Sequence, residues 1–363
     1  MHYFIFANKD SSIYSSDIIQ NTGRDEILEI IKTFQSSSYS GVINSTLNSR
    51  ALVQFDLSYI SNSIVDGTIT SPRRFYLNMH ICRVEGQESQ TNLYVYPVSS
   101  SWVQGIGKRL DSIIRTTGVS WTASDGEVPT YWNNTGSDYL DNIVETASLW
   151  SDENTFQTTG HYTYELADMR VDVSSIVNSW LSGTYVNNGF LIKRSGGDET
   201  GSKDLGNIQF YSTDTHTVYN PKLEVAWDDS SFVTGTLTQS NMDDLFVYAK
   251  NLQATYNNRD KARVRISSRP KYPTKNYLLN SPYVVSWYLP SSSYYSIVDS
   301  QTEETIVGFD TSSAKISCDS LGNYFTIWCN GLHTQRTYRI KVKVVSGSLE
   351  SVYDIQNSFK IIR

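Results

Sequence analysis

This 363-residue chain has little cysteine and no cysteine motif. Its three cysteines, Cys82, Cys318 and Cys329, are odd in number, and none stands in C-x-x-C spacing, so neither a disulfide framework nor a zinc site is indicated. Cys318 and Cys329 could pair with each other. Because free cysteine is among the most buried residue types, we instead expect free thiols on strands, folded in a reducing cytoplasm.

Positive charge and long apolar runs are also scarce. The net charge is −7, and Lys and Arg form no basic stripe, which argues against a nucleic-acid partner. No segment approaches the roughly 18 consecutive apolar residues of a membrane span. The opening "MHYFIFANKD" lacks the basic n-region and long apolar h-region of a signal peptide. We therefore expect neither classical export nor membrane insertion.

The sequence also lacks the motifs of common enzymes and metal sites. Its five histidines are scattered, without H-E-x-x-H spacing, and there is no G-x-S-x-G elbow. The segment "GDETGSKD" (197–204) only loosely resembles a phosphate-binding loop and predicts a polar hairpin tip. The acidic pairs at 228–229 and 243–244 could bind calcium, but surface charge is the simpler interpretation. We predict no catalytic residue, no cofactor and no metal.

Aromatic residues are abundant, at 13% with 25 tyrosines, and Ser, Thr and Asn are frequent, which favours β structure. Segment 25–34 allows a helix or a strand, and we prefer the strand. Segment 171–181 predicts a helix capped by Asp172 or Ser174, with an apolar stripe that ends at Gly183. Period-2 patterns and turn residues predict the remaining strands of the first 230 residues at 3–7, 49–57, 74–84, 91–98, 147–150, 161–167, 189–194, 206–213 and 221–227.

Five segments in order carry a family resemblance: "RALVQFDLS" (50–58), "LYVYPVSSSWVQGIGK" (93–108), "GVSW" (118–121), "VDVSSIVNSWLSGTYVNNGFLIK" (171–193) and "IQFYST…NPKLEVAW" (208–227). They resemble the DNRLRE family of extracellular domains, which implies a jelly-roll β-sandwich over residues 1–230. In this setting Trp102 would plug one end of the sandwich, with Gly105 and Gly107 turning the chain. Trp102 and Trp121 are therefore expected to serve as core and lid rather than as a ligand platform.

A polar stretch at 226–244 separates this region from a second one, residues 231–363. We expect an exposed linker near 228–240 between independently folding domains. The second region has the strand count of an immunoglobulin-like sandwich, although the Cys…Trp…Cys hallmark is missing. Its predicted strands lie at 244–252, 261–270, 282–289, 293–300, 304–310, 315–320, 323–332 and 336–346.

The second region, with "RPKYPTKNY" (269–277), "YLPSSSYYSIVDSQTEETIVGFDTSSAKISCDSLGNYF" (288–325) and "RTYRIKVKV" (336–344), resembles virion structural proteins of contractile-tailed phages, particularly T4-like phages of marine bacteria. The resemblance implies a non-enzymatic tail, baseplate or neck component that acts as scaffold or decoration. Its partners would be other virion proteins and copies of itself. Its location would be the virion, which a protein folded in the host cytoplasm reaches without a signal peptide.

Two groups of aromatic residues are candidate contact sites. Segment 286–300 concentrates Trp287, Tyr288, Tyr294 and Tyr295, a composition typical of protein interfaces. If the segment is extended, Tyr294 and Tyr295 face opposite ways, and at least one of them should be exposed.

The alternative function is a carbohydrate-binding adhesin for host-surface glycans. Its candidate contacts in the 122–160 loop are Tyr131, Trp132, Tyr139 and Trp150. A depolymerase ranks last, because the sequence does not pair the carboxylates that glycosidase chemistry needs. The acidic residues considered, which are more typical of solvated surface, are Asp141, Glu145, Asp152, Glu153 and Glu165.

Overall fold

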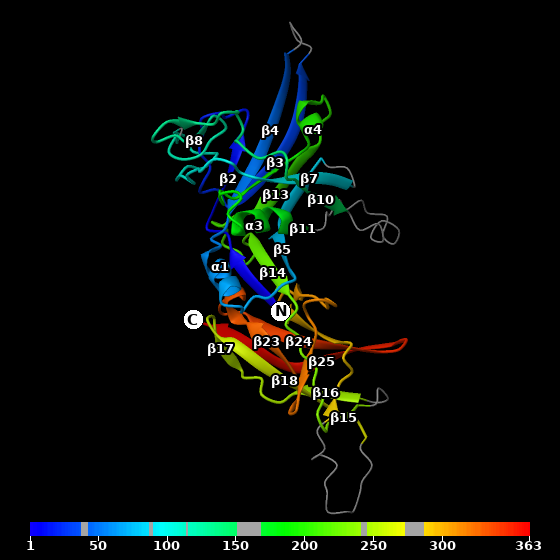
Figure 1. The fold of residues 1–363 in the computed structure, drawn as a ribbon. Coiled ribbons are helices and arrows are strands. Elements are labelled where there is room, and N and C mark those ends of the chain that lie inside the picture. The colour runs from blue at the N-terminus through cyan, green and yellow to red at the C-terminus, as the bar shows by residue number, and fades with distance from the viewer. Residues whose placement is uncertain (38–42, 87–89, 114, 151–167, 241–244, 273–286) are drawn as a thin grey trace, which may run out of the picture. The chain divides into compact units, whose positions relative to one another are not determined.

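The computed structural model describes residues 1–37, 43–86, 90–113, 115–150, 168–240, 245–272 and 287–363 (Figure 1). The fold is nearly all β, as predicted, with strands arranged in several sheets. The chain forms two compact units. We call Ile5–Asn62 with Arg74–Glu224 the N-terminal unit, and Met1–Phe4, Ser63–Arg73 and Val225–Arg363 the C-terminal unit. Among the described residues no helix has the length and apolar character needed to cross a bilayer.

A large antiparallel sheet organises the N-terminal unit, in the order β10-β7-β12-β4-β3-β13-β6, with β2 also paired to β4. Its strands are β2 (Lys9–Tyr14), β3 (Ile27–Ser37), β4 (Ile43–Gln54), β6 (Ile81–Glu85), β7 (Gln90–Pro97), β10 (Glu145–Trp150), β12 (Phe190–Lys193) and β13 (Gly206–Tyr211). A second sheet has the order β1-β14-β5-β11, made of β1 (His2–Phe6), β14 (Lys222–Trp227), β5 (Arg73–Met79) and β11 (Met169–Asp172). A small hairpin joins β8 (Ala123–Asp125) to β9 (Thr130–Tyr131).

Most predicted strands of this unit are confirmed, including the strand preferred at 25–34. The single strand predicted at 74–84 is wrong, because the chain breaks at His80 into β5 and β6, which belong to different sheets. Strand β2 was not predicted. Its polar residues Asp10, Ser11 and Ser12 are buried, which hides the period-2 pattern. The strand predicted at 161–167 lies outside the described residues.

The helix predicted at 171–181 is confirmed as α3 (Ser174–Leu181), with Ile176, Val177 and Trp180 buried. The N-cap position is Val173, whose side chain makes no capping bond, and the predicted capping residue Asp172 lies one position earlier, where its Oδ1 accepts from Ser174 N at 2.9 Å. Ser174 Oγ instead accepts a hydrogen bond from Phe75 N at 2.9 Å. The other α-helices within the described ranges are α1 (Ser58–Val65), which was not predicted, and α4 (Gly196–Thr200), a single turn where a polar hairpin tip was expected.

The C-terminal unit is a β-sandwich. One sheet has the order β16-β18-β23-β22, and the other has the order β17-β25-β24-β20-β21 (Figure 1). One apolar core draws residues from both sheets, such as Val264 and Phe325 from the first and Ile340 and Phe359 from the second. The strands of this unit are β15 (Thr238–Gln239), β16 (Leu245–Ala249), β17 (Thr255–Asn257), β18 (Lys261–Pro270), β19 (Trp287–Tyr288), β20 (Ser293–Asp299), β21 (Thr305–Val307), β22 (Ser317–Asp319), β23 (Gly322–Trp328), β24 (Thr337–Ser346) and β25 (Leu349–Ile362), with a 3-10 turn at Cys329–Gly331.

The expected linker near 228–240 contains backbone that is paired within the C-terminal unit. Val233 N donates to Cys318 O at 2.9 Å, and Cys318 N donates to Ser231 O at 2.8 Å. Asp228 forms an ion pair with Lys315 at 3.2 Å, whereas the acidic pair at 243–244 lies outside the described residues. The last boundary between the two compact units lies between Glu224 and Val225, a few residues before the expected linker. That the two regions fold independently stays a prediction.

All three cysteines are free. Cys318 and Cys329 are buried, as expected for packed thiols, and burial raises the pKa of Cys318 to about 11 and that of Cys329 to about 12. Cys82 on β6 is exposed, so the expectation of burial is wrong for that residue. The side chains of β6 are only partly covered, because this strand ends the large sheet.

Candidate functional site

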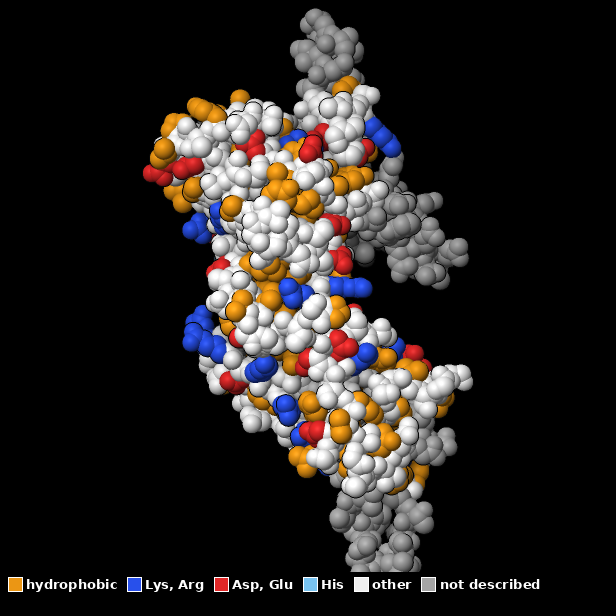
Figure 2. Space-filling view, viewed as in Figure 1, with side chains coloured by type: hydrophobic (Ala, Val, Ile, Leu, Met, Phe, Trp, Pro, Cys, Tyr) orange, Lys and Arg blue, Asp and Glu red, His pale blue; other side chains and the backbone are white. Residues whose placement is uncertain are grey.

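Exposed aliphatic residues gather on the loops that surround the β8–β9 hairpin of the N-terminal unit. Figure 2 shows hydrophobic side chains over these loops. We name this region the apolar loop surface, and its residues have exposed fractions between 46% and 93%. Its members are Ile18, Ile19, Val103, Ile106, Leu110, Ile113, Val128 and Tyr131. Monomeric proteins rarely leave so much contiguous apolar surface in water, which makes this surface the candidate functional site.

Backbone hydrogen bonds bring the segments of this surface together. Thr122 N donates to Ile18 O at 3.1 Å, which joins the 18–19 segment to the hairpin. Val103 N donates to Ser124 O at 3.0 Å, and Gly126 N donates to Gly118 O at 2.9 Å. The apolar residues are therefore carried by adjacent segments of chain.

The buried amide of Asn21 holds the loop from beneath. Its Nδ2 donates to Gln104 O at 2.7 Å and to Val119 O at 2.8 Å. Its Oδ1 accepts from Gly107 N at 2.9 Å and from Gly23 N at 3.2 Å. These four bonds use the whole hydrogen-bonding capacity of the amide, so one side chain fixes both ends of the 104–119 segment.

Two other polar residues extend this support. Gln20 Nε2 donates to Lys108 O at 2.8 Å, and its Oε1 accepts from Arg115 N at 3.2 Å. Both oxygens of Asp25 accept from Arg109 N, at 3.2 and 3.3 Å. Burial raises the pKa of Asp25 to about 6, and the Arg109 N–H opposes that rise. The loop that bears Leu110 is thus bonded on both sides of its tip.

Close glycine packing makes the base of the loop compact. Gly105 and Gly118 both have positive φ, at 80° and 99°. A Cβ atom added to Gly118 would lie 2.4 Å from Gly105 Cα, which is closer than any side chain allows. Only glycine therefore fits this contact between two backbones.

Arg109 turns from the loop toward the large sheet. Its guanidinium forms an ion pair with the buried Glu29 and lies 4.2 Å from the ring centroid of Tyr14. Tyr14 OH donates to Glu29 Oε2 at 2.7 Å, while Asn207 and Gln209 donate to Oε1, each at 2.8 Å. Burial raises the pKa of Glu29, but these hydrogen bonds and Arg109 outweigh it, and the net pKa is lowered. Glu29 is therefore a charged anchor for the loop.

Trp102 anchors the start of the loop in the core, as predicted. It is only 3% exposed and packs with Ile13, Leu52, Val119 and Leu191. Its Nε1 donates to Asn188 O at 2.8 Å, and Lys9 Nζ lies 4.3 Å from the ring centroid. Trp121 is partly buried against the same cluster, with Arg50 4.9 Å from its ring centroid. Both rings have packing roles.

A buried charge cluster lies behind this region. Glu199 of α4 accepts from Arg50 Nη2 at 2.7 Å and from Lys193 Nζ at 2.9 Å, and all three side chains are nearly inaccessible. Lys32 Nζ donates to Glu199 O at 2.9 Å, and burial lowers its pKa. Burial also lowers the pKa of Arg194 to about 10. Glu199 is the central counter-charge of this cluster.

The predicted interface residues of segment 286–300 occupy two places in the C-terminal unit. Trp287 and Tyr288 form β19, and the ring of Tyr288 meets that of Phe232 edge-on at 6.0 Å. Tyr295 is 3% exposed and stacks on Phe325 at 4.2 Å. Tyr294 is half-buried on the opposite face, with Lys343 Nζ 5.9 Å from its ring centroid. Whether this segment contacts a partner stays a prediction.

The predicted glycan contacts do not form one surface platform. Tyr131 is 70% exposed, but Trp132 is 5% exposed and its Nε1 donates to Ser120 O at 2.9 Å. Tyr139 packs against the same core cluster as Trp132, and its ring lies tilted against that of Tyr96, with 4.7 Å between the ring centroids. Trp150 ends β10, and its side chain lies outside the described part of the structure. Of the three aromatic side chains described, only Tyr131 is open to a ligand.

Groups that could do chemistry are few in the described parts. A His–Asp pair joins His80 Nδ1 to Asp168 Oδ2 at 3.0 Å, and Asp168 Oδ1 accepts from Ile81 N at 2.7 Å. This pair fixes the corner between β5 and β6. No group of three or more His, Cys, Asp or Glu side chains suited to a metal ion occurs among the described residues. The depolymerase candidates Asp152, Glu153 and Glu165 lie outside them.

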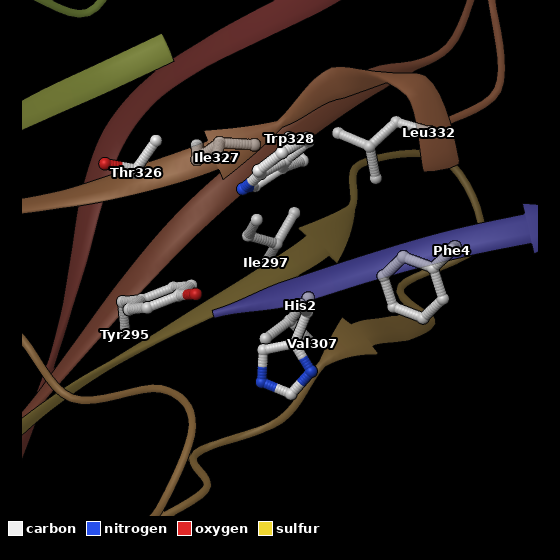
Figure 3. Close-up of a pocket in the computed structure, with 9 residues that line it drawn as sticks. All are labelled: His2, Phe4, Tyr295, Ile297, Val307, Thr326, Ile327, Trp328 and Leu332. Carbon is white, nitrogen blue, oxygen red and sulfur yellow. The ribbon is translucent and has the colours of Figure 1, made fainter. Parts of the chain in front are cut away.

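A small cavity lies inside the C-terminal sandwich (Figure 3). Its volume is about 10 Å³, and its walls include Tyr295 and Ile297 of β20, Ile327 and Trp328 of β23, and His2. A space of this size holds one water molecule. It does not admit an organic ligand.

Comparisons with known proteins do not assign this chain to a family. The chain matches no protein-family model and no curated protein. Among solved structures it is similar to a β-glucuronidase of Parabacteroides merdae, with 8% identity, a TM-score of 0.20, and coverage of 99% of this chain and 35% of that one. It is also similar to a DUF4785 family protein of Legionella pneumophila, with 9% identity, a TM-score of 0.19, and coverage of 100% of this chain and 64% of that one. This chain thus spans less than two thirds of the length of either protein.

Proposed function

We propose that this chain is a non-enzymatic structural protein of a phage virion, a component of the tail, baseplate or neck that works through contacts with other proteins. The observation that carries the proposal is the apolar loop surface, where Leu110 is 93% exposed on a loop with a rigid base. An exposed aliphatic surface gains free energy when a partner covers it. A recognition surface held in one conformation loses little entropy on binding.

The virion assignment rests on the sequence resemblance of the second region to phage structural proteins. Two further observations support a role in protein contacts. The acidic residues Asp25 and Glu29 are engaged in supporting the loop. The aromatic pair Phe232 and Tyr288 is partly exposed in the C-terminal unit and offers a second contact area. Under this proposal the protein is located in the assembled virion.

The test is a density map of an intact virion that carries this chain, together with protein identification from purified particles. We expect several copies per particle, with the apolar loop surface covered by protein on each copy. Absence of the chain from purified particles would overturn the proposal. So would a map in which this surface faces solvent on every copy. Binding to a host glycan array by a chain absent from the particle would favour an adhesin instead.

A further inference from the structure

We propose that the partner of the apolar loop surface is the same surface on a second copy of this chain, related by a twofold axis. The inference rests on the proposed function, because it names the partner of the same site. In such an isologous contact each surface must be complementary to itself. Three properties of the apolar loop surface meet that requirement: its area, its charges and its rigidity.

The area is sufficient for a stable dimer. The eight side chains, all at least 46% exposed, together present on the order of 800 Å², which is what one partner contributes to an interface of standard size. Leu110 and Ile113, 93% and 66% exposed, supply aliphatic area that a partner would desolvate. Because these residues are short and branched, they lose little side-chain entropy when they are ordered.

The charges around the apolar residues carry both signs. The exposed cations include Lys108 and Arg115, and the exposed anions include Asp17, Asp111 and Glu127. Lys108 Nζ also lies 3.7 Å from Glu26 Oε1 of the same chain. When such a surface meets its own copy, cations of one molecule can face anions of the other. A rim of one sign would repel its copy. The mixed rim therefore favours a second copy over a strongly charged partner.

The same mixture argues against a lipid surface as the partner. Loops that enter anionic membranes combine apolar side chains with an excess of Lys and Arg. Here the three exposed anions named above outnumber the two cations, so there is no excess of Lys and Arg. The support beneath the loop also suits a rigid protein contact, because Asn21 fixes the base with four hydrogen bonds before any partner arrives.

The first experiment is sedimentation velocity of the full chain over a concentration series. We expect concentration-dependent dimers. In the double variant Leu110→Ser/Ile113→Ser, the dissociation constant should rise at least about tenfold, because two large aliphatic contacts are lost. The matched control is Val186→Ser, an aliphatic residue 74% exposed elsewhere in the N-terminal unit, which should leave the dissociation constant unchanged. Equal weakening by both changes would overturn the inference.

A second experiment tests self-complementarity directly. The variant Lys108→Glu/Arg115→Glu makes the rim more acidic, and the variant Asp17→Lys/Glu127→Lys makes it more basic. We expect each to dimerise more weakly than the natural chain, and an equal mixture of the two to regain dimers as mixed pairs. A mixture that stays monomeric overturns the proposal, as does a natural chain that is monomeric throughout or that pellets with anionic vesicles without self-associating.

These outcomes separate the inference from the proposed function. A monomeric chain that is present in virions, with its apolar loop surface against a different protein, would end this inference only. A chain that dimerises through this surface but is absent from virions would end the proposed function and leave the dimer standing.

Discussion

Asn21 and Gly107 are 86 residues apart in sequence, yet Asn21 Oδ1 accepts a hydrogen bond from Gly107 N at 2.9 Å. The same amide also binds Gln104 and Val119, so the loop that carries Leu110 and Ile113 depends on a residue outside it. A buried amide in this position is difficult to replace, because each of its partners is a backbone group with few alternatives.

The change Asn21→Ala is expected to cost about 2–4 kcal/mol in the free energy of unfolding, because it leaves buried backbone groups unpaired. Urea unfolding of the full chain measures this cost, and hydrogen exchange should show faster exchange at Gly107 N. The matched control is Asn142→Ala, an exposed amide of the same unit, for which we expect a change within about 0.5 kcal/mol. Equal costs for the two changes would contradict the support role of Asn21.

The change Trp102→Ala is expected to destabilise the protein by about 3–5 kcal/mol, because a buried indole leaves a cavity. Tyr131→Ala removes an exposed aromatic ring from the same unit, and thermal melting should be nearly unaffected. If instead Trp102→Ala melts like the natural protein, the ring does not act as a core plug. A glycan-binding role for Trp102 would require that second result.

The change Glu199→Gln removes the charge that Arg50 and Lys193 share in the interior. Because it leaves two buried cations without their counter-charge, we expect a loss of about 3–5 kcal/mol in chemical unfolding. Glu85→Gln breaks the exposed pair with Arg83 and should change stability by less than about 1 kcal/mol. A small effect at Glu199 would mean that the cations rearrange to reach water.

Stability should fall as the pH rises from about 4, the ordinary pKa of an aspartate, to about 7, and Asp10 should account for part of that fall. Burial raises the pKa of Asp10 to about 7, against the opposing hydrogen bonds from Thr213 N and Thr213 Oγ1. The folded state therefore keeps a proton that the unfolded chain has already lost. Asp25, with a pKa of about 6, acts in the same direction.

The variant Asp10→Asn tests this pH dependence. Its free energy of unfolding should vary less between about pH 5 and about pH 8 than that of the natural protein, with a difference on the order of 3 kcal/mol, because the folded-state pKa of about 7 lies about 2 above the lower pH. Urea unfolding at about pH 5 and about pH 8 gives both slopes. Parallel slopes for the two proteins would show that Asp10 is ionised throughout.

Local patterns in the sequence predicted much of the fold. Strands such as β13 and β24 alternate buried with partly exposed residues, and α3 carries an apolar stripe. In these elements the order of apolar and polar residues in the sequence follows the burial of the side chains, so the pattern predicts the element. Strand β25 was missed, because most of its side chains up to Ser358 are exposed and its first half lacks an apolar face. Strand β2 was missed for the opposite reason, since it buries polar side chains.

The candidate site was only half predictable. Trp102 was expected in the core because large aromatics are usually buried, and it is. The exposure of Leu110 and Ile113 was not expected, since the same rule places aliphatic residues inside. A clue was available in their neighbours: "GKRLDSIIRT" (107–116) mixes charges with aliphatics at neither a period of 2 nor a period of 3.6. The Asn21 contacts could not be inferred, because they span 83 to 98 residues.

The close approach of Gly105 and Gly118 has a consequence for how this protein can vary. Inward-facing groups hold the loop, whereas Leu110 and Ile113 face water, so different side chains serve support and recognition. Exchanging the outward residues therefore alters what the surface recognises while the framework beneath stays intact. The binding specificity of the surface and the stability of the fold can therefore change separately. Related chains could acquire new binding partners by substitution at the loop tip alone.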